Sequence, residues 1–194
     1  MSIAILGIIM VPLSGLVFAY LHNTDATNAR LLETHDVQIT SDYFAQDVAS
    51  IGTRNTATPP ALNQSIELNV AYNAGLFPCG PAGTPSAIVR FAWDDFATAT
   101  SGATQIRVAY VVRTVGSETQ LHRLVCSGSA ALTSDAVLAH RVVALTPPTV
   151  TCSSSCTGSG TSVPSKVTMT LTVKDPRNPL APYIVVLTGQ RRQS

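Results

Sequence analysis

Hydrophobic and polar positions divide the chain into three zones. Residues 1–21 are apolar at almost every position, and between residues 22 and 52 apolar residues recur at helical spacing. From Thr53 onward, short runs rich in β-branched residues alternate with Gly, Pro, Ser and Asn. This order predicts an α+β protein, in which a long N-terminal helix packs on an antiparallel β-sheet head formed by residues 53–194.

The apolar zone is long enough to cross a bilayer. At about 1.5 Å per residue, a helix of residues 1–21 reaches about 31 Å, close to the hydrocarbon thickness. Apolar residues occupy every face, which fits a buried core helix poorly. A signal peptide cleaved after Ala19 stays as an alternative, although no Lys or Arg precedes the run. We expect residues 2–21 to lie in membrane lipid, which makes a single-pass protein with an extracytoplasmic head.

A proline and two small residues are expected to affect the shape and packing of this predicted helix. Pro12 lies in mid-run and predicts a kink, which membrane helices tolerate when neighbours re-satisfy the freed carbonyls. Gly15 and Ala19 stand four positions apart, a spacing that lets another helix approach closely.

Residues 22–52 predict an amphipathic continuation of the helix, which ends at Gly52. Its apolar residues form two stripes, interrupted by Asp36 and Asp47. One stripe holds Leu32, Ile39 and Tyr43, and the other holds Val37, Phe44, Val48 and Ile51. Two stripes indicate two partners, the head and neighbouring copies. A single wide face buried under the head is the alternative, and periodicity does not decide between them.

The head reads as a series of short strands, the clearest of which alternates Val167, Met169, Leu171 and Val173 on one face. Turn chemistry after residue 174 predicts a terminal hairpin. Residues 134–144 fit a short helix or a strand equally well. Strands are predicted at Ser65–Tyr72, Ser86–Asp94, Thr104–Arg113, Gln120–Cys126, Val142–Leu145, Lys166–Val173 and Tyr183–Leu187.

Charge and cysteine content narrow the function. With 12 basic and 11 acidic residues, the chain has no general basic surface for nucleic acid. All four cysteines follow the apolar zone, and the even number suits an oxidising exterior. Three pairings are possible; we prefer Cys79 with Cys126 and Cys152 with Cys156. A zinc site is the alternative, but the typical Cys-x-x-Cys and His spacings are missing.

No enzyme motif or cofactor fingerprint is found in the sequence, so we expect neither catalytic residues nor a bound cofactor or metal. The histidines are scattered. His22 and His35 fall in the predicted helix, and His122 and His140 stand beside arginines in a pattern typical of an exposed strand edge. A Ser-His-Asp site assembled in space is not visible at this level.

Two segments resemble the type IV pilin family. Ser2-Ile3-Ala4-Ile5-Leu6-Gly7-Ile8-Ile9 is similar to the second half of the prepilin N-terminal methylation signature, and Asp47-Val48-Ala49-Ser50-Ile51-Gly52 resembles the segment that closes the long helix in minor pilins and type II secretion pseudopilins of the W and J types. The leader, the Gly-Phe processing site and the family's glutamate do not precede Ser2. We therefore expect that the start was assigned late or that the leader was left out.

The resemblance implies a bacterial minor pilin or pseudopilin, a structural subunit of a type IV pilus or a type II secretion or competence pseudopilus. Its partners would be other pilin subunits and the assembly platform, and its location the membrane or a surface filament. The alternative is a single-pass membrane-anchored binding or adhesion domain, and a secreted hydrolase comes third. Whether the subunit serves adhesion, motility, DNA uptake or secretion is not encoded in these patterns.

Overall fold

The structure is a computed structural model that describes residues 15–16, 18–20, 24, 34–55, 61–96, 102–174 and 182–192. The chain forms two compact units, Met1–His35 and Asp36–Ser194, which are called the N-terminal unit and the C-terminal unit below. In the N-terminal unit, the described residues 15–16, 18–20, 24 and 34–35 are helical.

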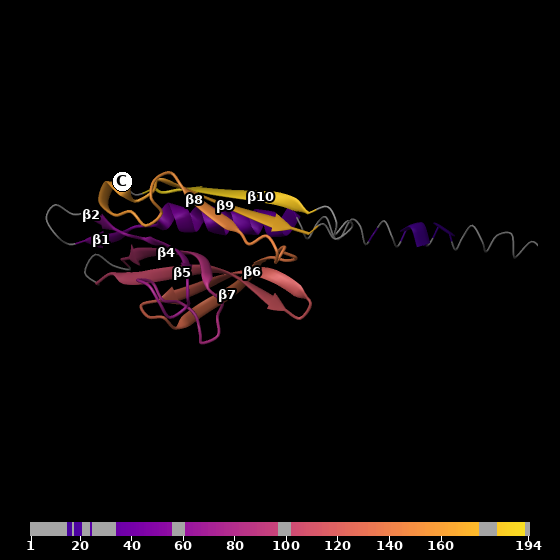
Figure 1. The fold of residues 1–194 in the computed structure, drawn as a ribbon, viewed down its shortest axis with the longest axis horizontal. Coiled ribbons are helices and arrows are strands. Elements are labelled where there is room, and N and C mark those ends of the chain that lie inside the picture. The colour runs from indigo at the N-terminus through magenta and orange to yellow at the C-terminus, as the bar shows by residue number, and fades with distance from the viewer. Residues whose placement is uncertain are drawn as a thin grey trace, which may run out of the picture. The chain divides into compact units, whose positions relative to one another are not determined.

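The C-terminal unit consists mostly of antiparallel β-sheet (Figure 1). A five-stranded sheet has the order β3-β4-β5-β6-β7, a three-stranded sheet has the order β10-β9-β8, and β1 pairs with β2. The strands are β1 Thr53–Asn55, β2 Ala61–Asn63, β3 Ile66–Val70, β4 Ala87–Asp95, β5 Thr104–Val115, β6 Glu118–Ser127, β7 Leu132–Ala139, β8 Thr149–Cys152, β9 Lys166–Val173 and β10 Tyr183–Gln190. One 3-10 turn, η1, covers Gly160–Ser162.

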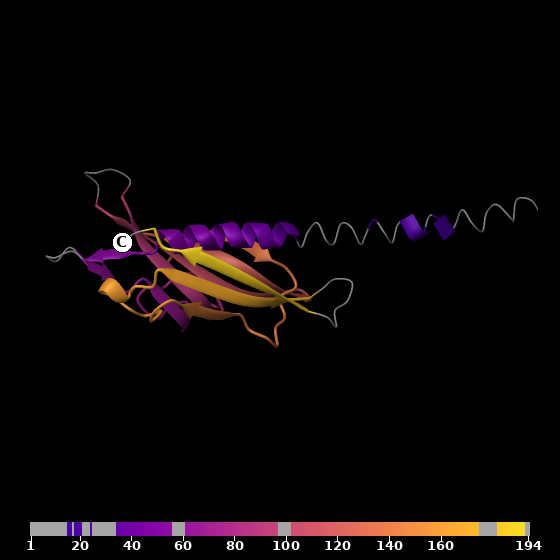
Figure 2. The ribbon, with the colours of Figure 1, turned by 90° about the horizontal axis from the view of Figure 1, so that it is seen from above.

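Residues 36–50 of this unit form a helix that lies against both sheets (Figures 1 and 2). Its buried side chains share one core with the inner faces of the five-stranded and three-stranded sheets. The helix ends at Ser50. Two residues later, Gly52 has a φ of 144°, which suits glycine, and its N–H donates to the carbonyl of Ala92 at 3.1 Å. The chain thereby passes from the helix directly into β1, beside β4.

Local sequence explains the strongest strands. In β9, the alternating Val167, Met169, Leu171 and Val173 are buried, as expected of a strand with one face on the core. β9 pairs with β10 over its whole length, so the predicted terminal hairpin strands are neighbours. β5 and β6 are joined by a tight turn at Gly116, whose φ of 62° fits a two-residue hairpin loop.

Most of the predicted strands are found, with some errors. The strands expected in the regions of β3, β4, β5, β6, β9 and β10 are present. Residues 142–145 were wrongly predicted as a strand, because only Val142 makes an isolated bridge, to Val173. The ambiguous segment 134–144 begins as β7, and β8 was missed. The short strands β1 and β2 were not predicted either. β7 and β8 contain Thr and Ser among few large apolar residues, so neighbouring strands rather than hydrophobic pattern decide their conformation.

The predicted α+β fold with a long N-terminal helix was wrong. Sheet dominates the described residues, and their longest helical stretch is 34–50. Most helical stability in proteins comes from packing of an amphipathic face. Residues from 36 onward have such a core to pack on, and it is there that a sustained helix is described. The long helix that the pilin resemblance implies is therefore not supported.

The predicted membrane-spanning helix over residues 1–21 and the single-pass localisation are corrected as well. No helix within the described residues has both the length and the apolar content required to cross a bilayer. The stretch 34–50 carries Asp36, Asp42 and Asp47, and these charged side chains make it too polar to cross a bilayer. Pro12 and the predicted kink lie outside the described residues.

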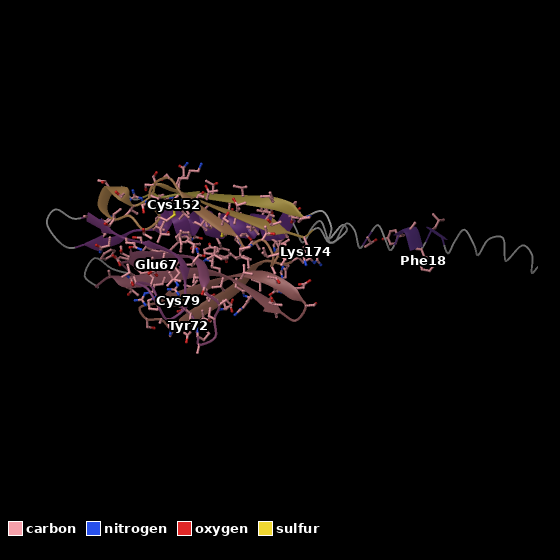
Figure 3. All side chains as sticks on the ribbon, in the orientation of Figure 1. Phe18, Glu67, Tyr72, Cys79, Cys152 and Lys174 are labelled. Atoms are coloured by element: carbon pink, nitrogen blue, oxygen red, sulfur yellow. A yellow bond between two sulfur atoms is a disulfide. The ribbon has the colours of Figure 1, made fainter. Side chains whose placement is uncertain are left out.

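Both disulfides of the structure lie in the C-terminal unit: Cys79 is bonded to Cys126, and Cys152 to Cys156. This is the pairing preferred from the sequence. Figure 3 shows Cys79 and Cys152 at the two opposite sheets. Cys79 and Cys126 belong to a second, small core on the face of the five-stranded sheet that points away from the helix. The bond between them compensates for the few apolar side chains there.

We predict that the two disulfides contribute unequally to stability. They close chain separations of 47 and 4 residues. In the chain-entropy treatment these separations correspond to about 4 kcal/mol for the longer loop and about 2 kcal/mol for the shorter. Urea unfolding measures the loss of unfolding free energy in two double variants, Cys79→Ala/Cys126→Ala and Cys152→Ala/Cys156→Ala. Equal losses would contradict this ranking.

Candidate functional site: the docked helix and its buried charges

The helix of the C-terminal unit buries one predicted stripe completely. Phe44, Val48 and Ile51 have no exposed surface, and Val37 packs at the edge of the same core. The ring of Phe44 meets those of Phe91 and Tyr110 edge to face, with both centroid distances at 5.7 Å. This stripe belongs to the head and is not available to another subunit.

The other predicted stripe does not form a free apolar face either. Ile39 packs against the same core, and Leu32 lies outside the described residues. Tyr43 is 38% exposed, but the guanidinium of Arg123 lies 4.8 Å from the centre of its ring. The exposed helix residues Gln38, Asp42 and Gln46 are polar. Of the two interpretations of the stripes, the wide face covered by the head fits the described residues.

Asp47 joins the helix to the five-stranded sheet. Its side chain is 1% exposed and accepts hydrogen bonds from Arg123 Nε at 2.8 Å and Arg123 Nη2 at 2.6 Å. The Tyr110 hydroxyl donates to the same carboxylate at 2.7 Å. An ionised carboxylate is tolerated in a core only when it is paired and hydrogen-bonded in this way. In the sequence, Asp47 interrupts the apolar stripes and begins the segment that resembles the end of a minor-pilin helix, but neither feature indicates its partners Arg123 and Tyr110.

This network shifts the acid–base behaviour of its members. Burial, and next the negative charge of Asp47, raises the pKa of Tyr110 well above its usual value. Burial alone would lower the pKa of Arg123, but its hydrogen bonds and attraction to Asp47 outweigh burial, and the pKa is raised. Tyr110 is therefore a neutral donor and Arg123 a permanent cation.

Polar contacts also hold the first turns of this helix. Asp36 Oδ2 accepts hydrogen bonds from the backbone N–H and the Nδ1 of His140, both at 2.9 Å. The Thr40 hydroxyl donates to the carbonyl of Leu138 at 2.7 Å. These bonds attach the helix to the end of β7, so the helix is positioned at both ends of its described length in this unit.

A second charged cluster surrounds His122, which is 4% exposed. Its Nδ1 lies 2.8 Å from Asp135 Oδ1 and 2.7 Å from Arg113 Nη2, and its Nε2 lies 3.1 Å from Gln120 Oε1. Burial alone would raise the pKa of Asp135, but its bonds with His122 and Arg113 prevail and lower that pKa. The expectation of an exposed His122 was wrong, because the neighbouring strands cover it. The side chain of His140 is 46% exposed.

Glu67 and Arg90 form a third buried pair, at 3.4 Å. Glu67 accepts hydrogen bonds from the backbone N–H groups of Leu76 and Phe77, and Arg90 donates to the carbonyls of Val70, Ala71 and Ala74. A side chain at Gly75 would approach Glu67 Oε1 to 2.3 Å, so glycine is required there. Together, these contacts fold the loop after β3 over the sheet (Figure 3).

A shallow groove of about 620 Å³ lies next to the His122 cluster. Its walls are the loop Pro81–Pro85, the neighbouring ends of β5 and β6, and Ala144; Arg113 is its only charged residue among those described. The hydrogen-bond partners of His122 are Asp135, Arg113 and Gln120. No group of three or more His, Cys, Asp or Glu within the described ranges is placed to hold a metal ion.

The buried charges described above orient a helix and loops of the C-terminal unit. Comparison of the chain with protein-family models, curated proteins and solved structures found no match.

We predict that Asp47→Asn strongly destabilises the C-terminal unit. The substitution leaves the buried Arg123 without its counter-charge, and breaking a buried pair in this way typically costs about 3–5 kcal/mol. Glu118→Gln is the matched control, because the Glu118–Arg141 pair is 3.5 Å long and well exposed. Such an exposed pair contributes about 0–1 kcal/mol. Urea unfolding at neutral pH compares the two, and similar losses would contradict the assigned role of Asp47.

We also predict an alkaline loss of stability through Tyr110. Because the folded state raises its pKa, the stabilisation is complete below the unfolded value near 10.0 and declines as pH rises toward the folded value. Above pH 10 the unfolding free energy should therefore fall less steeply with pH in Tyr110→Phe than in the wild type, because phenylalanine cannot ionise. Tyr72→Phe serves as control for a tyrosine outside the network. An unchanged slope in Tyr110→Phe would overturn the prediction.

Proposed function

We propose that this chain is a structural subunit of a pilin-like filament, of the minor pilin or pseudopilin kind. One observation carries the proposal: the side chains of Leu16, Phe18 and Tyr20 are 68%, 72% and 71% exposed. Large apolar side chains grouped within five positions and left open are typical of a surface that another molecule covers. They lie in the apolar zone of residues 1–21, after the segment Ser2–Ile9 that resembles the prepilin signature.

The occupant that we propose is the same segment of neighbouring subunits. Such a contact matches apolar surface with apolar surface and removes both from water. Gly15 and Ala19 lie on the same stretch, and no atom of a described residue stands within 4 Å of the position that a side chain on Gly15 would take. Small residues at this spacing permit close approach of a neighbouring helix.

The helix of the C-terminal unit does not offer a competing contact. Most of its apolar side chains pack into the core of the C-terminal unit, Tyr43 lies under Arg123, and its other exposed residues are polar. This arrangement supports a division of roles, in which the N-terminal unit makes the filament contact and the C-terminal unit is carried as a rigid domain. The disulfides and buried ion pairs suit a domain that must stay folded outside the cell.

We predict that the Leu16→Glu/Phe18→Glu double variant is lost from filaments. Carboxylates in a closely packed apolar contact carry a large desolvation penalty. The measurement is the amount of this chain in the sheared filament fraction of its host, relative to the amount in whole cells. The control is Leu145→Glu, which changes a side chain 96% exposed in the C-terminal unit.

Near-complete loss of the double variant from the fraction, with normal incorporation of the control, is the expected result. Normal incorporation of the double variant would overturn the proposed contact. Absence of the wild-type chain from the filament fraction would instead favour a binding or adhesion domain acting on its own.

A further inference from the structure

Among the described residues, β10 forms one edge of the three-stranded sheet. The Arg191 N–H donates to the Ser165 carbonyl at 2.8 Å, directly beyond the pair Gln190↔Lys166. Bonded and non-bonded positions alternate in an antiparallel ladder. Val185, Leu187 and Gly189 therefore bond to β9, whereas Ile184, Val186 and Thr188 direct their N–H and C=O groups away from it.

The helix closes this edge only at its carboxyl end. There the Arg192 N–H donates to the Ala49 carbonyl at 3.1 Å, and a side chain on Gly189 would come within 2.4 Å of Val48. Toward the amino end, Figure 2 shows β10 diverging from the helix. Ile184 and Val186 are 68% and 60% exposed, and no described residue bonds to their outer backbone groups.

Exposed edges usually carry features that prevent pairing, such as charges, prolines, bulges or a covering helix. Between Ile184 and Thr188, β10 has no charge, proline or bulge. The opposite edge strand of the other sheet, β7, is irregular: its pairing with β6 shifts register at two places, and it carries Asp135. β10 pairs regularly along eight residues and contains no charged residue or proline. A regular, uncharged edge with exposed β-branched residues is suited to accept another strand.

We propose that β10 pairs with β10 of a second copy of this chain, antiparallel across a two-fold axis at Val186. The outward-directed residues are symmetric about that position: Val186 would face its own counterpart, and Ile184 would face the second copy's Thr188. All these side chains are β-branched, which favours cross-strand contact, and no like charges meet. The result is one continuous sheet of the order β8-β9-β10-β10-β9-β8.

The residues of β10 favour a second copy of the same chain as the partner of this edge. The open stretch Ile184–Thr188 is centred on Val186, so the same groups supply donors and acceptors to both copies, as an isologous contact requires. The basic residues Arg191 and Arg192 would lie at opposite ends of the paired strands, away from their own counterparts. This contact uses the C-terminal unit alone and does not depend on the proposed filament contact.

Cross-linking tests the axis directly. Because the native cysteines are all in disulfides, Val186→Cys provides the single free thiol. A short bis-maleimide reagent should then link two copies of the full chain through residue 186. Thr151→Cys is the matched control, since Thr151 is exposed on β8 at the other edge of the same sheet. Both are made in the Leu16→Glu/Phe18→Glu background, which removes association through the N-terminal unit.

A cross-linked dimer from Val186→Cys, and little from Thr151→Cys, is the expected result. In sedimentation velocity, the same background without added cysteine should show a dimer that Val186→Lys abolishes, since two ammonium groups would then meet at the axis. Leu145→Lys, which places a charge elsewhere on the unit, should leave the dimer intact. A monomer at every concentration, or equal cross-linking of the two cysteine variants, would overturn the proposal. The proposal would also be overturned if β10 of the purified chain paired only with a different polypeptide.

Discussion

The carboxylate of Asp47 lies in the core between the helix and the five-stranded sheet, and the arrangement of the C-terminal unit depends on how it is satisfied. Removing a carboxylate from water is so unfavourable that it requires a counter-charge and several donors in good geometry. Arg123 and Tyr110 meet this requirement from neighbouring strands. A helix shifted by one turn would bury Asp47 without them, so the apolar face alone does not select the position, whereas the charge does.

Two other charged clusters fix local geometry in the C-terminal unit in a similar way. The Glu67–Arg90 pair binds the loop after β3 through backbone N–H and carbonyl groups, which turns an irregular segment into a fixed one. The His122 cluster connects β5, β6 and β7 where the β6–β7 pairing is irregular. In each case, polar groups specify geometry that hydrophobic contact leaves open, while the Cys79–Cys126 disulfide supports the face with the smaller core.

Sequence patterns predicted the parts of the fold that depend on local order. The alternation in β9 and the buried stripe of Phe44, Val48 and Ile51 follow from periods of two and 3.6 residues. Long-range pairings were not predictable in this way: Asp47 and Arg123 are 76 positions apart, and nothing near either residue indicates the other. The apolar run of residues 1–21 was likewise visible in the sequence, but such a run does not show whether lipid or protein surrounds it.

The two proposed contacts differ in symmetry, and this difference has a consequence for assembly. In a filament, the N-terminal segments would meet through different faces, and such a heterologous contact propagates without limit, whereas the proposed two-fold contact at β10 is isologous and is complete once two copies meet. A chain that forms both would join one filament to another through its C-terminal units. The strength of that junction would be set by the short open stretch of β10, because the helix occupies the remainder of the edge at Ala49. Lateral association of this kind would be weak per subunit and would gain strength from repetition along the filament.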